Sequence, residues 1–401
     1  MVEVIKLDHL GRGIGKLDGK IIFIHNALPN EIVSVKIIKD KKRYYEGIVT
    51  EYKKLSNKRI QPLCPYYDKC GGCDLMHLDY NDELKFKQEK IENIINQYVN
   101  ENIKINKIIE SDNIYNYRNK LTLHINNKIG LYQKQSNDII EIDKCLIVDD
   151  KINKIINDLK KYKINTKEIV IKASNKETMI SYNGNISKIE DLNCSNIWEN
   201  SKLTKGNGYI QEKIGNLTFQ ISPEAFFQVN TKQTKKLYDK IKVMANLSKN
   251  DQVLDLYCGT GTIGLYLSDA CSKVLGVEIN EQAINNANNN KKINNIKNAE
   301  FIVGDAKKVI KDIKFKPSVI IVDPPRSGLF KGMVDDLIKF NANKIIYVSC
   351  DPMTLARDLN ILQEHYEITE IQPVDLFPHT HHVECIAKLI RKMQRLLIST
   401  Y

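Results

Sequence analysis

The distribution of apolar and polar residues divides the chain into three parts. Residues 1–55 contain short β-rich segments separated by glycines and by Asn30, which are turn signals. This pattern is typical of a small Greek-key barrel of the oligonucleotide-binding type. The segments that we expect to form strands are residues 2–7, 20–24, 32–38 and 44–52.

The middle part combines one helical pattern with several strand patterns. Residues 56–80 form a loop that carries a cluster of cysteines, and apolar residues recur at helical spacing from Asn81 to Tyr98. The strand patterns that follow are separated by long connections, so their order in a sheet does not follow from the sequence. They cover residues 120–125, 130–133, 169–171 and 217–221.

After about residue 235, buried strand runs alternate with helical patterns. This alternation predicts an α/β domain with a doubly wound, mostly parallel sheet. We therefore expect a barrel over residues 1–55, a central α+β domain over residues 56–220 and an α/β domain over residues 221–401. The strand runs of the last domain are residues 252–256, 273–278, 300–303, 319–322 and 344–348.

Composition and charge narrow the function classes. The chain of 401 residues is 42% hydrophobic, and it has neither an apolar run that could cross a membrane nor a secretory signal at its start. We expect a cytoplasmic monomer with no membrane partner, whose nine cysteines are reduced thiols, catalytic groups or metal ligands. The net charge of +11 favours a polyanionic partner, and residues 1–60 hold 13 Lys and Arg against 7 Asp and Glu. A general bias toward Lys, Asn and Ile would give the same charge without any RNA binding.

A glycine-rich turn follows the first strand of the C-terminal domain. Gly259, Gly261 and Gly264 complete the pattern G-x-G-x-x-G, in which the backbone can turn sharply and approach a ligand. Glu278 ends the next strand, where its carboxylate can accept hydrogen bonds from both ribose hydroxyls, and Asp305 follows the third strand, where it can face an adenine. This spacing fits a dinucleotide as well as S-adenosylmethionine, but no Lys-Ser or Lys-Thr follows the glycines as in a P-loop. The place of the turn in the domain and Asp305 favour S-adenosylmethionine.

Three further motifs come at the ends of later strands or just before the final strand. Residues 323–326 read Asp-Pro-Pro-Arg, Cys350 directly precedes Asp351-Pro352, and residues 379–384 read His-Thr-His-His-Val-Glu. The carboxyl ends of strands are where ligands bind in such sheets. Because Asp351 is a suitable N-cap and Pro352 suits the first turn, we predict that a helix begins there. Its N-terminus is expected to lower the pKa of the Cys350 thiol.

These residue types suit methyl transfer to C5 of uracil. That carbon is a poor nucleophile, and addition of a thiolate at C6 turns the ring into an enolate that can take a methyl group. A base must then remove the C5 proton, and we expect Glu384, next to an apolar strand, to have a raised pKa. Each residue alone has a plainer interpretation, since Cys350 could be a buried hydrophobic residue and Glu384 a surface group. The histidines at 379, 381 and 382 match no zinc spacing.

Together these motifs resemble the RNA uracil-5-methyltransferase family, whose members act on large-subunit rRNA or on the tRNA T-loop. The resemblance covers nearly the whole chain and implies a Rossmann-like class I methyltransferase domain that binds S-adenosylmethionine. By this resemblance Cys350 is the nucleophile and Glu384 the base. Gln228, Tyr257, Glu278 and Asp323 match cofactor-binding positions, and Gln228 and Asp323 can also touch the uracil. The segments that carry the resemblance are residues 222–230, 255–261, 323–326, 349–354 and 379–384.

Four cysteines before the C-terminal domain form a separate site. Cys64, Cys70 and Cys73 are spaced C-x5-C-x2-C, and Cys145 follows later. Their spacing fits either zinc or an iron–sulfur cluster. The rRNA branch of the family resembles this arrangement and carries a [4Fe–4S] cluster, which implies these four residues as ligands. A fourth cysteine argues against a radical enzyme, which leaves one iron without a cysteine. Apart from Cys350, we assign the remaining cysteines to packing. They are Cys194, Cys258, Cys271 and Cys385.

Residues 1–55 resemble a TRAM domain, an RNA-binding barrel at the start of rRNA-directed members of the family. The match rests on residues 11–13, 18–20 and 28–31. Asn30 stands where glycine is usual, and asparagine tolerates a positive φ. Residues 117–120, Tyr-Arg-Asn-Lys, also recur in the family and either contact phosphate or form a solvated strand edge. The basic run at residues 391–395 and the following residues 396–401 extend beyond the family pattern.

The motifs and the resemblance predict methylation of uridine C5 in 23S rRNA to give 5-methyluridine. A tRNA T-loop enzyme is the alternative, because the catalytic motifs are shared. A catalytically inactive RNA-binding or ribosome-assembly protein would need neither Cys350 nor Glu384. A redox or radical enzyme is disfavoured by the complete set of four cysteines.

Overall fold

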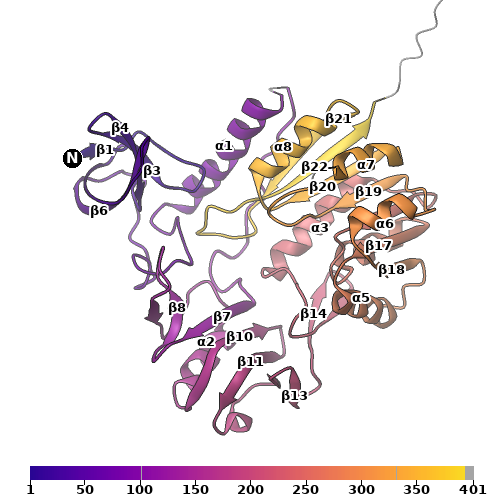
Figure 1. Ribbon diagram of the computed structural model, residues 1–401, viewed down its shortest axis with the longest axis horizontal. Coiled ribbons are helices and arrows are strands. Elements are labelled where there is room, and N and C mark those ends of the chain that lie inside the picture. The colour runs from indigo at the N-terminus through magenta and orange to yellow at the C-terminus, as the bar shows by residue number, and fades with distance from the viewer. Residues whose placement is uncertain (101, 331, 393–401) are drawn as a thin grey trace, which may run out of the picture.

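The computed structural model describes residues 1–100, 102–330 and 332–392, with the side chains of residues 311 and 312 left aside. Three β-sheet units follow one another along the chain and occupy three corners of the molecule (Figure 1). Most of the basic C-terminal segment that extends beyond the family pattern, from residue 393 on, lies outside the described residues. Among the described residues, no helix combines the length and the apolar composition of a membrane span.

The N-terminal unit is a six-stranded sheet in the order β1-β5-β6-β4-β3-β2, folded around a small core of Val2, Val4, Ile22, Ile24, Ala27 and Val33. A Cβ at Gly15 would lie 2.3 Å from a methyl group of Val2, so only glycine lets β1 pack on β3 and close the sheet. Asn30 has φ +69°, as predicted for its place in the TRAM pattern. The strands are β1 (Val2–Glu3), β2 (Lys6–Leu7), β3 (Gly13–Leu17), β4 (Lys20–His25), β5 (Ile32–Asp40) and β6 (Tyr44–Lys54).

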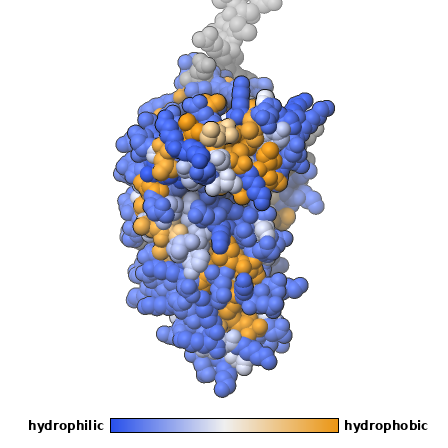
Figure 2. All heavy atoms as spheres, turned by 90° about the vertical axis from the view of Figure 1, so that its left-hand side faces the viewer, coloured by the Kyte–Doolittle hydropathy of each residue, from blue (hydrophilic) through white to orange (hydrophobic). Residues whose placement is uncertain are grey.

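The barrel leaves several large apolar side chains in solvent. Figure 2 shows hydrophobic patches over the upper part of this side of the molecule, where the barrel lies. The exposed large apolar residues of the barrel include Ile5, Ile21, Ile37, Ile38 and Ile48. Scattered exposed apolar residues are normal for a folded protein, and here they interleave with lysines.

Helix α1 (Tyr80–Tyr98) lies between the barrel and the C-terminal unit (Figure 1). Asp79 caps its N-terminus by accepting a hydrogen bond from the backbone N–H of Asn81. Its buried residues, Leu84, Ile91, Ile94 and Ile95, join a core that belongs mainly to the C-terminal unit. The helix predicted for residues 81–98 is therefore confirmed, and it packs against helix α8 (Pro352–Leu362).

The central unit is a seven-stranded sheet in the order β13-β12-β11-β10-β7-β8-β9, covered by α2 (Asp150–Leu159). Ile152, Ile155 and Ile156 of α2 pack on Leu123 and Ile169 of the sheet. The strands are β7 (Lys120–Ile125), β8 (Ile129–Tyr132), β9 (Ile139–Glu141), β10 (Ile164–Ala173), β11 (Thr178–Ile186), β12 (Asn196–Glu199) and β13 (Lys202–Lys205), with a short 3-10 helix η1 (Ile189–Asp191).

A hairpin of β14 (Ile210–Ile214) and β15 (Leu217–Ile221) leads into the C-terminal unit and packs on it. That unit is a seven-stranded sheet in the order β18-β17-β16-β19-β20-β22-β21, in which only the pairings of β22 are antiparallel. All five predicted strands are confirmed. The strands are β16 (Gln252–Leu256), β17 (Lys273–Glu278), β18 (Ala299–Val303), β19 (Val319–Val322), β20 (Lys344–Ser349), β21 (Tyr366–Val374) and β22 (Glu384–Arg391).

Helices cover both faces of the C-terminal sheet, as expected for a Rossmann-like class I methyltransferase fold. One core contains residues of α3, α4 and α5, and the other contains residues of α6, α7 and α8 together with α1. The parallel strands all end at the same edge, so the motifs predicted at their carboxyl ends come together there. The helices are α3 (Thr231–Ala245), α4 (Thr262–Leu267), α5 (Glu281–Ile293), α6 (Ala306–Asp312) and α7 (Met333–Phe340), with η2 (Ser268–Ala270) after α4.

Candidate active site

The glycine-rich turn between β16 and α4 has the backbone shape that its sequence predicts. Tyr257, Gly259 and Gly261 all have positive φ, at +62°, +52° and +76°. A Cβ at Gly261 would lie 2.7 Å from the ring of Phe301, so this position requires glycine. Asp255, buried at the end of β16, accepts a hydrogen bond of 2.9 Å from the backbone N–H of Gly264 and ties α4 to the strand.

Polar groups around this turn suit a nucleoside. The Glu278 carboxylate accepts hydrogen bonds from the backbone N–H groups of Gly259 (3.2 Å) and Asn280 (3.0 Å), and its remaining lone pairs can accept ribose hydroxyls. The Tyr257 hydroxyl is buried without a hydrogen-bond partner, and burial raises the pKa of Tyr257 to about 12. A buried hydroxyl without a partner is costly unless a ligand supplies one. Asp305 caps α6 by accepting from the N–H of Lys307.

Gln228 lies in the segment between β15 and α3, which the central unit holds in place. Asn119, just before β7, donates to the carbonyl of Gln228 at 3.1 Å, and its own N–H donates to the carbonyl of Val229 at 2.8 Å. Asn230 then caps α3. The half-buried Gln228 is therefore fixed through its backbone, and its amide is not used in these contacts.

Cys350 and Glu384 lie side by side at the edge of the sheet. In the antiparallel pairing of β20 with β22, Ser349 is opposite Cys385. The residue that follows β20, Cys350, is therefore next to the residue that begins β22, Glu384. Asp323 follows the neighbouring strand β19, and its backbone N–H donates to the carbonyl of Leu256. The predicted helix after Cys350 is confirmed, since Asp351 accepts from the N–H of Thr354 at 2.9 Å and Pro352 begins α8.

The pKa of the Cys350 thiol differs from the one that the sequence predicts. Burial, together with the negative charges of Glu384 and Asp323, raises the pKa of the Cys350 thiol to about 12. The sequence predicted a lowered pKa from the N-terminus of α8, and this prediction is wrong because desolvation and two acidic neighbours outweigh that effect. Arg326 acts in the opposite direction and favours the thiolate.

The two acids have raised pKa values. Burial and the nearby Asp323 raise the pKa of Glu384 to about 8, which confirms the direction predicted for a base beside an apolar strand. Burial raises the pKa of Asp323 to about 7. A thiol between two carboxyl groups that titrate near neutral pH can pass its proton to one of them. Such a group of residues fits nucleophilic catalysis coupled to proton transfer.

Comparison with known proteins shows the family of the chain. The tRNA (uracil-5-)-methyltransferase family profile matches residues 187–392, and a TRAM domain profile matches residues 1–50. The chain belongs to the tRNA (uracil-5-)-methyltransferase family. It is therefore a methyltransferase of a family that uses S-adenosylmethionine and acts on RNA. A DNA methylase profile also matches residues 39–289, a range that includes neither Cys350 nor Glu384.

Relatives of this family member share its whole length. An uncharacterized RNA methyltransferase of Oceanobacillus iheyensis is 35% identical over 439 aligned positions, which cover 96% of this chain and 95% of the relative. One from Clostridium acetobutylicum is 37% identical, with 96% of this chain and 95% of the relative covered. In structure, the chain is similar to the Pyrococcus abyssi tRNA (uracil-54, C5)-methyltransferase in complex with S-adenosyl-L-homocysteine. The TM-score is 0.80 and the identity 29%, over 97% of this chain and 100% of that one.

The four cysteines of the methyltransferase that were predicted as ligands come together between the barrel and the central sheet. The pKa of the Cys73 thiol is raised well above its usual range, first by burial and then by the neighbouring Cys145, Cys70 and Cys64. All four are only partly exposed thiols, and none is in a disulfide. In the part of the chain that the structure describes, no group of three His, Cys, Asp or Glu side chains is placed to hold a metal ion.

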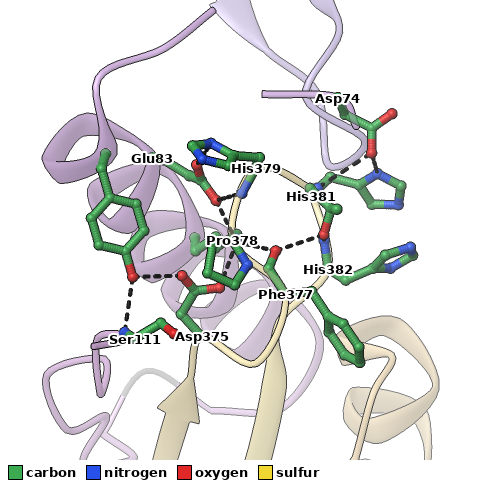
Figure 3. A network of polar contacts seen from close by, with 12 residues as sticks. Asp74, Glu83, Ser111, Asp375, Phe377, Pro378, His379, His381 and His382 are labelled. Atoms are coloured by element: carbon green, nitrogen blue, oxygen red, sulfur yellow. Dashed lines mark hydrogen bonds and ion pairs between the residues drawn. The ribbon is translucent and has the colours of Figure 1, made fainter. Parts of the chain in front are cut away.

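The histidines of residues 379–382 take part in hydrogen bonds with carboxylates. His381 Nδ1 lies 2.6 Å from a carboxylate oxygen of Asp74, and the backbone N–H of His379 donates to Glu83 at 2.8 Å (Figure 3). Glu83 and Asp375 also share the buried ammonium of Lys87, at 2.7 Å each. Four residues of this network carry no signal in the sequence and were not predicted: Asp74 of the cysteine loop, Glu83 and Lys87 of α1, and Asp375, which follows β21.

Tyr117 and Asn119, in the segment of residues 117–120, contact segments that carry predicted site residues. The buried Tyr117 donates its hydroxyl proton to the carbonyl of Pro378 at 3.0 Å, close to the histidine segment. Asn119 holds the Gln228 segment, as described above. Arg118, which donates to the carbonyl of Lys120, and Lys120, which lines a cavity along the central sheet, are the basic residues of this segment.

Proposed function

We propose that this methyltransferase forms 5-methyluridine in RNA, with Cys350 as the nucleophile and Glu384 as the base. The observation that carries the proposal is the register of β20 and β22, in which Ser349 is opposite Cys385. It brings the nucleophile and the base to the same edge of the sheet as Asp323 and the glycine-rich turn. Family membership supplies the reaction class.

The first step forms a bond between Cys350 Sγ and C6 of the uracil. Because burial keeps the free thiol protonated, its proton must leave as the bond forms, and the ionised form of Asp323 accepts it, which leaves Glu384 ionised for the later step. The C5–C6 electron pair moves into an enolate on the uracil. Arg326 favours negative charge at this position.

Bound S-adenosylmethionine supplies the electrophilic methyl group that the enolate carbon takes. Glu384 in its ionised form then removes the proton from C5. The electron pair of the broken C–H bond restores the C5–C6 double bond, and the Cys350 thiolate leaves. Each step uses residues that lie together at the carboxyl edge of the sheet.

We propose that Gln228, Tyr257, Glu278 and Asp323 hold S-adenosylmethionine. The unpartnered Tyr257 hydroxyl and the two N–H groups that orient Glu278 support this site. Replacing Glu278 with Ala should weaken binding of S-adenosylhomocysteine at least about tenfold, because a carboxylate that accepts two hydroxyl groups is lost. Titration calorimetry measures this, and unchanged affinity would remove Glu278 from the site.

We propose 23S rRNA as the substrate, in keeping with the TRAM barrel and the four cysteines. A second candidate is the uridine of a tRNA T-loop. It is favoured by the similarity to a tRNA (uracil-54, C5)-methyltransferase over 97% of this chain, because that coverage includes the barrel. The shared architecture therefore does not by itself distinguish the two substrates.

One experiment separates these substrates. The protein is incubated with labelled methyl donor and with unmodified 23S rRNA or tRNA, and the methylated nucleotide is mapped. Methylation of 23S rRNA at a uridine C5 is the expected result. Methylation of tRNA alone would replace the rRNA proposal, and methylated cytidine or the absence of product on both RNAs would overturn uridine methylation itself.

We propose that Cys64, Cys70, Cys73 and Cys145 hold a [4Fe–4S] cluster that stabilises the loop between barrel and central sheet. The closeness of the four thiols, three of which raise the pKa of the partly buried Cys73 further, supports a shared group that binds their ionised forms. Methyl transfer needs no electron from it, so its role is structural. Protein purified without oxygen should be brown and contain iron, whereas stoichiometric zinc without iron would contradict this assignment.

We further propose a monomer that works in the cytoplasm, where thiols stay reduced. Its domains would be residues 1–55, 56–220 and 221–401. Gel filtration with light scattering tests the monomer, for which the sequence mass is 46.1 kDa.

A further inference from the structure

The segment from Asp375 to Val383, which we call the catalytic loop, joins β21 to the strand that begins with Glu384. It has no regular secondary structure, so other parts of the chain must satisfy its backbone polar groups. Four elements do so, and Figure 3 shows part of this network. The carbonyl of Leu376 accepts a hydrogen bond from Asn230, that of Phe377 from Lys87, and that of Pro378 from Tyr117. The carbonyl of His379 accepts from the backbone N–H groups of Asp74 and Leu75, and that of His381 accepts from Lys90.

The loop holds one residue in an unfavourable backbone conformation. His379 has φ +67°, which is uncommon for a residue with a Cβ. Its N–H donates to Glu83, its carbonyl accepts from two backbone N–H groups after Cys73, and its ring packs on Tyr115 at 4.8 Å. A conformation of this kind persists only where surrounding contacts fix it. The cysteine loop, residues 64–75, is therefore one of the elements that shape the catalytic loop.

The cysteine loop also contacts a side chain of the catalytic loop. Asp74, which directly follows Cys73, places a carboxylate oxygen 2.6 Å from His381 Nδ1 and 3.4 Å from the His381 backbone N–H. Asp74 is about one-third exposed and His381 one-fifth exposed, so the pair is partly shielded from water. A carboxylate that accepts from Nδ1 fixes the orientation of the imidazole ring.

From His381 the contacts continue to the reacting groups. The His381 and His382 rings lie 4.1 Å apart, and His382 Nε2 lies 3.3 Å from a guanidinium nitrogen of Arg326. Burial raises the pKa of both Cys350 and Glu384, and the positive charge of Arg326 opposes that rise. Three consecutive contacts thus join the cysteine loop to Arg326, whose charge acts on Cys350 and Glu384.

We propose that Asp74 is a positioning residue for the methyl-transfer reaction: it orients His381, which packs on His382 and so holds Arg326 beside Cys350 and Glu384. The inference rests on the proposed function, because it assigns Asp74 a role in the addition of Cys350 to uracil. Asp74 itself need not touch the RNA or the methyl donor. The cysteine loop then contributes directly to the rate of the covalent step, in addition to stabilising the fold.

The test compares Asp74→Asn with Asp68→Asn in the full-length protein, purified without oxygen. Asp68 lies in the same loop, is exposed, and has only a 3.4 Å contact with Asn26, so it is a matched control. RNA containing 5-fluorouridine measures the rate of the covalent step, because this base traps the adduct. Asp74→Asn should slow adduct formation about tenfold, since an interaction with a charged acceptor is lost, while Asp68→Asn matches the wild type.

Three other readouts separate positioning from a general structural defect. Iron content, the affinity for S-adenosylhomocysteine and the affinity for unmodified RNA should be the same in Asp74→Asn and the wild type. His381→Asn, which keeps a donor near the position of Nδ1, should lose less activity than His381→Ala. In the double variant Asp74→Asn/His381→Ala, the loss should not exceed that of His381→Ala alone, because the two residues act through one contact.

Equal adduct rates for Asp74→Asn and Asp68→Asn, or fully additive losses in the double variant, would overturn the role of Asp74. Equal losses of adduct rate, iron and ligand affinity in Asp74→Asn would also overturn it. If wild-type protein forms no adduct with 5-fluorouridine RNA, the proposed function itself fails. The two failures therefore give different results.

Discussion

At the scale of single residues, the active site depends on groups whose ionisation is set by burial. Burial raises the pKa of Glu384 to about 8 and the pKa of Asp323 to about 7. It raises the pKa of the Cys350 thiol to about 12. Sequence motifs predicted that Cys350 and Glu384 act together, and the pairing of β20 with β22 brings them side by side. The motifs did not predict the raised pKa of the Cys350 thiol. The local effect of a helix N-terminus can be inferred from the sequence, but the desolvation of the thiol cannot.

The pH dependence follows from these values. Glu384 must be ionised to remove the C5 proton, and ionisation of the thiol also increases with pH. The single-turnover rate should therefore rise with pH through about 8, the folded-state pKa of Glu384.

Glu384→Gln should form the covalent adduct with ordinary uridine but fail to release it at every pH. A rate that stays flat from about pH 6 to about pH 9 would show that neither group limits the reaction.

The residues that hold the catalytic loop in place could not be predicted from the sequence. Asp74 is 307 positions from its partner His381, and Glu83 is 296 positions from His379. Nothing in the local pattern of either acidic residue distinguishes it from the many solvated Asp and Glu residues. Only the tertiary packing of α1 against the C-terminal unit brings these pairs together.

At the scale of elements, the sequence predicted those strands best that are buried on both faces of their sheet. The parallel strands β16, β17, β19 and β20 are buried on both faces and were predicted as continuous apolar runs. In the central sheet, β11, β12 and β13 were not predicted, because polar residues on their exposed face interrupt any apolar run. Helix α1 was predicted from its periodicity, but the core it joins could not be predicted.

Helix α1 is joined to the catalytic loop by a buried ion network, which gives a prediction for stability. Lys87, Glu83 and Asp375 are all fully buried, and Lys87 contacts both carboxylates. Lys87→Met should lower the free energy of unfolding by about 3–5 kcal/mol, because two carboxylates lose their buried cation. Urea unfolding measures the change. Lys85→Met, on the exposed side of the same helix, is the control and should have little effect; equal effects of the two changes would contradict the account.

At the scale of the whole molecule, three units converge on one edge of the C-terminal sheet. The pattern of apolar and polar residues predicted three units, but not that α1 shares its core with the C-terminal sheet. A cavity of about 1590 Å³ is lined by the central sheet, α5 and residues 222–224, and Cys350 and Glu384 do not line it. RNA that reaches the catalytic pair would therefore lie on a surface built by several units.

The basic barrel predicts a salt-dependent affinity for RNA. Lys41, Lys42 and Arg43 are exposed at the turn between β5 and β6. The double variant Lys41→Ala/Lys42→Ala should reduce the slope of log affinity against log salt by about 1.4, since each phosphate contact to a single strand contributes about 0.7. Filter binding at several salt concentrations measures it. Lys292→Ala/Lys297→Ala, exposed at the far end of α5 and in the loop after it, should leave the slope unchanged; the reverse pattern would place RNA away from the barrel.

The most direct test of the central claim is to identify the residue that attacks the uracil. Wild-type protein is incubated with S-adenosylmethionine and 5-fluorouridine RNA, digested, and examined by mass spectrometry for the peptide joined to a nucleotide. The fluorine at C5 cannot be removed as a proton, so the covalent intermediate should accumulate on Cys350 and carry the transferred methyl group. Cys350→Ala should give no adduct. An adduct on another cysteine, or one that persists in Cys350→Ala, would contradict the mechanism.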